Sequence, residues 1–205
     1  MSRAGLLWAF GLAVPLLLVV VLNAIPLDWS NSRTQQAAIA ALVVASGWFA
    51  GFLLREISQQ IGRTERLRDL HRALYSEIQH NLDNLGSEDE LKAHAEKMLA
   101  RMEEGDGFVP FIPRERNDTV FRAVVGDLHI LPRTSIDPVV RYYSQLAALD
   151  AMVEDMRGET FKEMSPRRRG EIYSDYIALK MRLVEFGTDA NARITAYDRA
   201  RKVWS

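Results

Sequence analysis

The chain has 205 residues, a formal net charge of −1 and no cysteine. The lack of cysteine excludes disulfides, thiolate metal ligands and cysteine nucleophiles, and the near-neutral charge argues against a dedicated nucleic-acid-binding protein. The sequence after the first quarter of the chain is rich in charge and long enough for one domain of ordinary size.

Two apolar runs open the chain, over residues 5–25 and 37–54, and neither contains a charged side chain. Each is close to the roughly 20 residues that a helix needs to cross a hydrocarbon core about 30 Å thick. Lysine or arginine at the bilayer centre costs on the order of 3 kcal/mol, so uncharged runs are typical of membrane spans. The sequence therefore predicts a transmembrane hairpin over residues 1–54, followed by a domain over residues 55–205.

The first run has two alternative interpretations, a cleavable signal peptide and a buried core helix. Leu22 stands where the cleavage consensus requires a small residue, so Ala24 supplies only half of that consensus. The stretch 16–22 is apolar on all sides, which leaves no polar face for a helix that borders water. We favour an uncleaved span.

The charges that flank the two runs predict the membrane topology. The loop 26–36 carries one aspartate and one arginine, whereas five arginines follow the second run: Arg55, Arg63, Arg66, Arg68 and Arg72. Basic residues near the ends of spans stay on the cytoplasmic side, where they can also contact anionic headgroups. We expect both termini in the cytoplasm and the loop 26–36 outside.

Small residues recur along the second run. Ala41 and Ala45 share one row of a helix, and Gly47 and Gly51 match the GxxxG pattern. Small residues let helix backbones approach closely in lipid, so this face predicts packing against the first span or self-association. The alternative is that alanine and glycine are simply common in spans.

The hydrophobic pattern becomes periodic after residue 55. Apolar residues recur at three- and four-residue steps as far as Leu85, so the second span is expected to continue as one amphipathic helix. Gly62 is a candidate interruption of that helix. The periodicity therefore predicts that the second span and the first helix of the cytoplasmic domain are one continuous helix.

Local signals predict the next two elements. Gly86 suits a helix C-terminus, and Ser87 with Glu90 forms a capping box that opens a helix through about Glu104. The segment 105–113 then combines two glycines and two prolines with four large apolar side chains. We expect a loop that packs on the helices, with a position at the membrane surface as the alternative.

A short helix and a long helical hairpin complete the predicted domain. Asp118 or Thr119 is a candidate cap for the short helix, which Leu131-Pro132 ends. The hairpin is expected to start at Asp137-Pro138 and again at Ser165-Pro166, because an N-cap residue followed by proline is a typical helix start. The joining segment is 157–164.

The two arms of this hairpin carry apolar seams at three- and four-residue steps, which favours antiparallel packing. Gly187 is expected to break the second arm before a last amphipathic segment. The alternating pattern of strands is absent from the sequence. The predicted fold class is all-α, with a two-helix transmembrane hairpin followed by a cytoplasmic helical bundle.

One short motif suggests chemistry. Glu77 and His80 form a Glu-x-x-His pair, which diiron carboxylate bundles place on their inner faces. Such a site needs a second pair and two further glutamates, and the chain has no second Glu-x-x-His. A homodimer is the one arrangement that would supply it. We therefore interpret Glu77, His80 and Asn81 as polar residues of a packed helix face and predict no metal, cofactor or catalytic residue.

Other functional motifs are missing from the sequence or have a simpler explanation. The phosphate-binding glycine loops, the zinc-protease motif and the nucleophile elbow are all absent. The only basic run, 167–169, stands in the first turn of a predicted helix. An anionic lipid or an acidic partner is one interpretation of it, and a solvated helix start is the interpretation that we favour.

Two short segments, 74–82 and 131–146, resemble a loose group of bacterial membrane proteins of unknown function. The resemblance rests on a Glu-Ile-x-x-Asn element and a later Leu-Pro, then Tyr, element, which cover Glu77, Asn81, Pro132, Tyr142 and Tyr143. It implies a bacterial inner-membrane protein with a hydrophobic anchor and a helical cytoplasmic region. We interpret the five positions as helix-packing and turn positions.

Three functional hypotheses follow. The first is a membrane-anchored interaction or scaffold protein that self-associates or docks a membrane or cytoplasmic partner. The second is a two-span effector that oligomerises and perturbs the bilayer in response to a signal. The third is a metal-dependent enzyme that uses Glu77 and His80. We rank them in that order, with the lipid bilayer as a partner in the first two.

Overall fold

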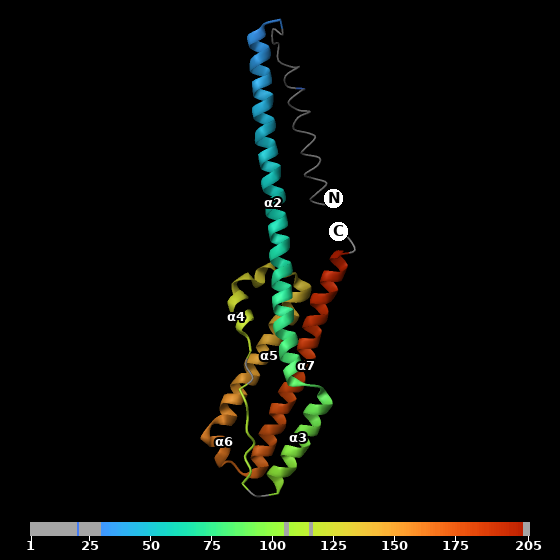
Figure 1. The fold of residues 1–205 in the computed structure, drawn as a ribbon. Helices are drawn as coiled ribbons and strands as arrows, with labels where there is room; N and C mark the ends of the chain where they lie inside the picture. The colour runs from blue at the N-terminus through green and yellow to red at the C-terminus, as the bar shows by residue number, and fades with distance from the viewer. Residues whose placement is uncertain (1–19, 21–29, 105–106, 115–116, 203–205) are drawn as a thin grey trace. The chain divides into compact units, whose positions relative to one another are not determined.

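The structure is a computed structural model that describes residues 20, 30–104, 107–114 and 117–202 (Figure 1). Its regular elements, within these residues, are all helical, which confirms the predicted all-α class. In chain order they are α2 (Ser32–Leu85), α3 (Glu88–Glu103), α4 (Thr119–Val124), the 3-10 helix η1 (Val125–Ile130), α5 (Arg133–Arg157), α6 (Glu159–Glu163) and α7 (Pro166–Lys202). The predicted first span, residues 5–25, lies almost wholly outside the described residues.

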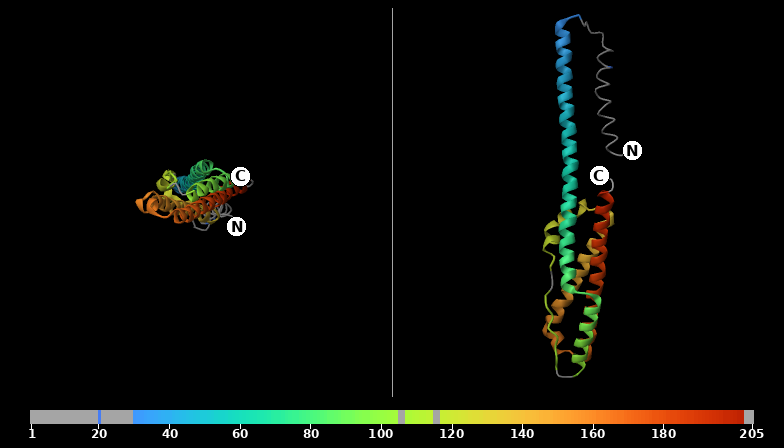
Figure 2. Two further views of the ribbon diagram at one scale, coloured as in Figure 1. Left: turned by 90° about the horizontal axis from the view of Figure 1, so that it is seen from below. Right: turned by 45° about the vertical axis from the view of Figure 1, so that its right-hand side comes forward.

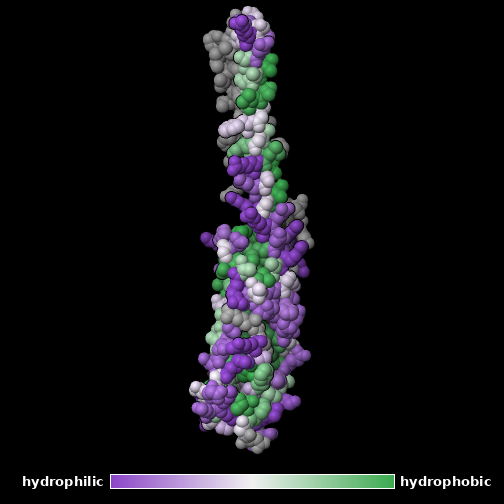
Figure 3. All heavy atoms as spheres, turned by 60° about the vertical axis from the view of Figure 1, so that its left-hand side comes forward, coloured by the Kyte–Doolittle hydropathy of each residue, from purple (hydrophilic) through white to green (hydrophobic). Residues whose placement is uncertain are grey.

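The chain divides into two compact units, Met1–Gly62 and Arg63–Ser205. Helix α2 contributes to both. In the first unit α2 exposes a run of large apolar side chains, and only 6% of its most apolar 18-residue window is buried. Figure 3 shows this apolar surface in green along α2. Among the described residues, α2 is the one helix long and apolar enough to cross a membrane.

The second unit has a core made of α5, α7, α3 and the last turns of α2. Helices α5 and α7 lie side by side along their lengths, and α3 packs on α7 (Figures 1 and 2). The most deeply buried side chains come from all of these elements: Leu74, Ile78, Met102, Val139, Tyr142, Leu183 and Ile194. All of these except Met102 stand in the amphipathic helix patterns that the sequence predicted.

The last part of α2 runs antiparallel to α7. Gln79 on α2 accepts a hydrogen bond from the Asn191 amide of α7 at 3.1 Å. His71, eight residues before Gln79 on α2, lies opposite Asp198, which is seven residues after Asn191 on α7. Gly187 completes the pairing by its close approach to Leu82. A rising number on α2 therefore matches a falling number on α7.

The local cap signals around residue 86 are confirmed. Gly86 has a φ of 77°, a left-handed conformation that favours glycine, and α2 ends one residue before it. The Ser87 hydroxyl accepts from the Glu90 backbone N–H, and the Glu90 carboxylate accepts from the Ser87 backbone N–H. The reciprocal capping box opens α3 as predicted.

Two predicted glycine breaks are wrong. Helix α2 continues through Gly62, and α7 continues through Gly187 as far as Lys202. A glycine inside a helix costs only about 1 kcal/mol relative to alanine, which the neighbouring residues of a long helix can offset. The physical role of Gly187 is instead steric, because the helix must come close to its neighbours there.

The predicted start of the α5 segment at Asp137-Pro138 is also wrong. The helix begins at Arg133, and Pro138 lies inside it. The N-cap is Pro132, whose carbonyl accepts the backbone N–H groups of Ser135 and Ile136 at 3.0 Å each. The residue before the helix therefore needs only an extended backbone and a free carbonyl, which Pro132 provides at φ −66° and ψ 151°.

Candidate functional site

Glu77 is a buried carboxylate on α2 that binds the N-terminus of α4. Its Oε1 accepts the Val120 backbone N–H at 2.6 Å, and its Oε2 accepts the Phe121 backbone N–H at 2.9 Å. The Tyr143 hydroxyl donates to the same Oε2 at 2.7 Å. The first N–H groups of a helix have no partner inside the helix, so a carboxylate placed there satisfies them and complements the helix dipole.

Tyr143 on α5 holds the other side of this carboxylate. Its ring stacks on Phe121 with the centroids 3.8 Å apart and the planes 12° from parallel. Burial and the hydrogen bond to Glu77 raise the pKa of the Tyr143 hydroxyl well above its usual range. Tyr143 therefore stays a hydrogen-bond donor at neutral pH, as the Glu77 carboxylate requires.

Asn81 lies one helical turn after Glu77 and faces the same side of α2. Its amide donates to the Asn117 carbonyl at 2.8 Å and to the Tyr142 hydroxyl oxygen at 3.0 Å. Tyr142 is fully buried, and that burial raises the pKa of its hydroxyl to about 12. These two hydrogen bonds from the Asn81 side chain connect α2 both to the segment before α4 and to α5.

Four of the five residues predicted as helix-packing polar residues therefore meet in one cluster, which we call the Glu77 cluster: Glu77, Asn81, Tyr142 and Tyr143. The fifth, His80, is an exception because its side chain is exposed and pairs with Asn84 at 3.1 Å on its own helix. At about 100° of rotation per residue, His80 and Asn81 lie on opposite sides of Glu77 and about 100° apart around α2, so Asn81 faces the core while His80 faces outward.

The metal interpretation of Glu77 and His80 finds no support in this geometry. Both Glu77 oxygens accept hydrogen bonds, from two backbone N–H groups and a tyrosine hydroxyl. Within the described part of the chain, no group of three His, Cys, Asp or Glu side chains is placed to hold a metal ion. The Glu77 cluster is arranged as a set of internal hydrogen bonds.

Asp118 occupies the predicted N-cap position of α4 without acting as a cap. Its side chain makes no capping hydrogen bond and instead lies 2.9 Å from the Arg122 guanidinium. Glu77 performs the capping from another helix. The prediction that Asp118 or Thr119 caps α4 located the start of the helix, but the N-cap residue Asp118 makes no capping hydrogen bond and the capping carboxylate is Glu77.

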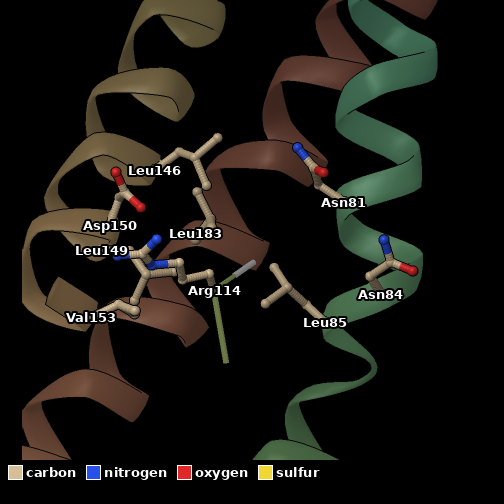
Figure 4. A pocket seen from close by; sticks show the side chains of 9 residues that line it. All are labelled: Asn81, Asn84, Leu85, Arg114, Leu146, Leu149, Asp150, Val153 and Leu183. Atoms are coloured by element: carbon tan, nitrogen blue, oxygen red, sulfur yellow. The ribbon is translucent and has the colours of Figure 1, made fainter. Parts of the chain in front are cut away.

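A cavity of about 290 Å³ lies beside the Glu77 cluster, and Asn81 lines it (Figure 4). Its apolar wall is made of Leu85, Leu146, Leu149, Val153 and Leu183. Its polar lining is Asn81, Asn84, Arg114 and Asp150. Arg114 also forms a two-point contact with Glu154, at 2.9 and 3.0 Å. The cavity is close to the smallest size typical of ligand pockets.

A second polar cluster, around His71, was not predicted from the sequence. The ring has no exposed surface; its Nε2 lies 2.9 Å from the Ser135 hydroxyl and its Nδ1 lies 3.6 Å from an Asp198 carboxylate oxygen. Serine, histidine and aspartate in this order are the residue types of a hydrolase triad. Ser135 is also fully buried, so no substrate can reach its hydroxyl in this structure. We call these three residues the His71 junction.

The basic run 167–169 has two different environments. Arg167 and Arg168 are exposed and pair with Glu171, as a solvated helix start would. Arg169 is only 4% exposed, and its Nη1 donates to the Lys162 carbonyl at 2.9 Å. The expectation of a solvated run is therefore wrong for Arg169, which joins α6 to α7.

The residues predicted to serve the membrane lie along α2. Ala41, Ala45, Gly47 and Gly51 fall in its apolar stretch, and the space around a Cβ at either glycine is open to 4 Å. The five membrane-proximal arginines, Arg55, Arg63, Arg66, Arg68 and Arg72, are all exposed. Their contacts with lipid or with another helix stay predictions.

Comparisons of the chain with protein-family models, with curated proteins and with solved structures return no match. The resemblance to bacterial membrane proteins through Glu77, Asn81, Pro132, Tyr142 and Tyr143 stays a hypothesis. Its five positions lie at the Glu77 cluster and at the start of α5.

Proposed function

We propose that this chain is a membrane-anchored helical interaction protein. The observation that carries the proposal is the continuity of α2, which runs unbroken from an exposed apolar stretch into the core of the second unit. Leu70, Leu74 and Ile78 of the same helix are buried in that core. One helix therefore serves both as the anchor and as a structural part of the domain.

The exposed apolar stretch of α2 is difficult to explain in water. Val44 is 71% exposed and Trp48 is 84% exposed, and Ile39, Val43, Phe52 and Leu54 are exposed as well. Burying one such side chain gains about 1.5–3 kcal/mol, so a contiguous exposed set marks a surface that lipid or another helix covers. An apolar window of 18 residues is about 27 Å long as a helix, close to the thickness of the hydrocarbon core.

The proposed topology places both termini in the cytoplasm of a bacterial cell, with the loop 26–36 outside the inner membrane. It is supported by the exposed arginines that follow the apolar stretch, starting at Arg55. The first span of the proposed hairpin is residues 5–25. In this arrangement the second unit is cytoplasmic.

An interaction role is favoured over catalysis because the buried polar groups are used in internal contacts. The Glu77 carboxylate accepts three hydrogen bonds, and the Ser135 hydroxyl has no exposed surface. A catalytic group needs access to a substrate as well as a suitable partner. We propose that the domain binds a second copy of the chain or a discrete membrane or cytoplasmic protein.

The anchor is tested by a matched pair of lysine substitutions. Val44→Lys places a charge in the apolar stretch, whereas Val140→Lys changes a valine that is 41% exposed on α5. We expect Val44→Lys to increase the share of the protein that alkali extracts from membranes and Val140→Lys to leave that share unchanged. Loss of wild-type protein from washed membranes would contradict the anchor.

The interaction role is tested by crosslinking in native membranes. A dimer or one discrete heteromeric product is expected from the wild-type chain, and a monomer without partners would overturn the proposal. Depolarisation of cells on expression, abolished by Gly47→Leu with Gly51→Leu, would instead favour the effector that perturbs the bilayer.

A further inference from the structure

The His71 junction joins three helices of the second unit. His71 lies on α2, Ser135 lies in the first turn of α5, and Asp198 lies near the end of α7. The Tyr197 ring packs against the His71 ring edge-on, with the centroids 5.2 Å apart and the planes at 72°. The junction is therefore the place where the last turns of α7 are held near α2 and α5.

The hydrogen-bond pattern accommodates a neutral ring. A proton on Nδ1 points toward Asp198, and Nε2 then accepts the proton of the Ser135 hydroxyl at 2.9 Å. The tautomer is assigned from these partners. The contact at Nδ1 is long at 3.6 Å, so this buried ring nitrogen has no hydrogen bond in the structure.

The His71 ring can accept a second proton without a change in its neighbours, but the resulting charge is poorly solvated. It would go to Nε2, which would then donate to the Ser135 hydroxyl oxygen, while that hydroxyl donates to the Pro132 carbonyl in the 3.3 Å hydrogen bond that the structure shows. The imidazolium would then be buried with Asp198 as the counter-charge, and the Asp198 side chain is 42% exposed. A partly solvated carboxylate at 3.6 Å repays only part of the cost of burying a charge.

The groups that face the His71 ring determine whether its neutral or its protonated form is favoured. Asp198 and Tyr197 face it from α7 and Ser135 from α5, and Asp198 is the one of the three that bears a carboxyl group. The charged neighbours in sequence are all exposed: Asp69, Arg72, Arg133, Asp137 and Arg199. Burial outweighs the attraction of Asp198, so the pKa of His71 lies below its ordinary value.

We propose that the His71 junction is a proton-sensitive latch that holds the last turns of α7 against α2 and releases them when the ring is protonated. Release gives the imidazolium access to water. Only the end of α7 has to move, because Gly187 and Asn191 hold the helix to α2 further back. Ala196 and Ala200, beyond the buried Ile194, are already exposed.

The sign of the effect follows from the lowered pKa. The closed junction binds a proton less readily than the open one, so it is favoured above the ordinary histidine pKa of about 6.5 and weakens as the pH falls below that value. Between the ordinary and the lowered pKa, each pH unit of acidification raises the ratio of open to closed junctions by up to about tenfold.

The latch is tested by distance measurements between two spin labels on the full chain in lipid nanodiscs. The chain has no cysteine, so Ser76→Cys with Ala196→Cys introduces the only two labelling sites, both exposed. We expect a longer-distance population to grow between pH 7.5 and pH 5.5. The control pair Ala93→Cys with Ala178→Cys, on α3 and α7, should keep its distribution over this range.

His71→Gln in the labelled chain removes the titrating group and should abolish the pH response of the Ser76–Ala196 pair. A distribution that does not change with pH, or a pH response that survives in His71→Gln, would overturn the latch. Because His71→Gln could also loosen the core, the ring is followed directly by NMR in the unlabelled wild-type chain. His71 should titrate at lower pH than N-acetylhistidine in the same buffer, and Asp198→Asn should lower its midpoint further. Titration at or above the pH of N-acetylhistidine would also overturn the proposal.

Discussion

Gly187 on α7 lies so close to Leu82 on α2 that a Cβ atom at the glycine would come within 2.9 Å of the Leu82 Cδ2 atom. The same Cβ would lie 3.0 Å from Cε2 of Tyr142 on α5. Three helices therefore meet at one glycine. The absence of a side chain there sets how near α7 can approach the other two.

Gly187→Ala should lower the free energy of unfolding by about 1–2 kcal/mol. Overpacking a tight site costs about 1–3 kcal/mol, and the better helix propensity of alanine returns part of it. Gly62→Ala is the matched control, because a Cβ there has open space to 4 Å, and it should leave the stability unchanged or raise it slightly. Urea unfolding followed by circular dichroism measures both; equal effects of the two substitutions would contradict the close approach.

Glu77→Gln should lower the stability by about 1.5–3 kcal/mol, the usual contribution of hydrogen bonds to a charged group. The neutral amide keeps one acceptor oxygen for three donors and places an NH₂ group where an acceptor is needed. Glu185→Gln, at an exposed glutamate of α7, is the control and should change the stability by less than about 0.5 kcal/mol. Thermal and urea unfolding are the measurements, and a stability of Glu77→Gln equal to that of the control would count against the capping role.

Alkaline pH should destabilise the domain through Tyr142. Its pKa is about 12 in the folded chain, above its unfolded value of about 10, so its contribution is complete below pH 10 and is lost as the pH rises toward 12. A shift of this size corresponds to roughly 2–3 kcal/mol. Urea midpoints at pH 9, 10 and 11 should fall less steeply for Tyr142→Phe than for the wild type. Parallel slopes would show that Tyr142 does not carry the effect.

Arg169→Met should destabilise the domain by about 1–3 kcal/mol, because it removes the hydrogen bond that a buried guanidinium donates to the Lys162 carbonyl. Arg168→Met is the neighbouring control. Its guanidinium is 63% exposed in the pair with Glu171, so we expect a change within about 0.5 kcal/mol. A reversed order in differential scanning calorimetry would disprove the buried role of Arg169.

Ser87→Ala should cost about 1 kcal/mol, the usual cost of removing an N-cap hydroxyl. Ser174→Ala is a suitable comparison, because the Ser174 hydroxyl bonds the Gly170 carbonyl within its own helix and its loss should be nearly neutral. The expected change for Ser87→Ala includes faster amide exchange in the first turn of α3. Unchanged exchange there would argue against the capping box.

The sequence predicted those parts of the fold that depend on near neighbours. The end of α2 at Gly86 and the start of α3 after Ser87 follow from backbone conformation and side chains within four residues. The errors at Pro138 and Gly187 have the opposite cause. The N-cap of α5 is Pro132 rather than Asp137, and the glycine at position 187 is explained by its close contacts with α2 and α5. At both positions, the rule that proline or glycine marks a helix boundary gave the wrong answer.

The polar clusters also combine features that depend on near neighbours, which were predictable, with contacts between residues far apart in the sequence, which were not. Glu77 and Asn81 are four residues apart, so their shared helix face was predictable. It was also predictable that these polar groups would have hydrogen-bond partners if buried. The identity of those partners was not, since Tyr143 is 66 residues from Glu77 in the sequence. The His71 junction had no local signal at all, because Ser135 is 64 residues from His71 and each residue type is common.

Capping of α4 by a carboxylate on α2 also sets an order of events in folding. The donors, at Val120 and Phe121, are 43 and 44 residues from Glu77, and α4 is only 6 residues long. A helix this short does not persist alone in water, and closing a long loop delays its stabilising contact. We therefore expect α4 to become helical only after α2 and α5 have docked, so that protection of its amides marks the completion of the domain and not its nucleation.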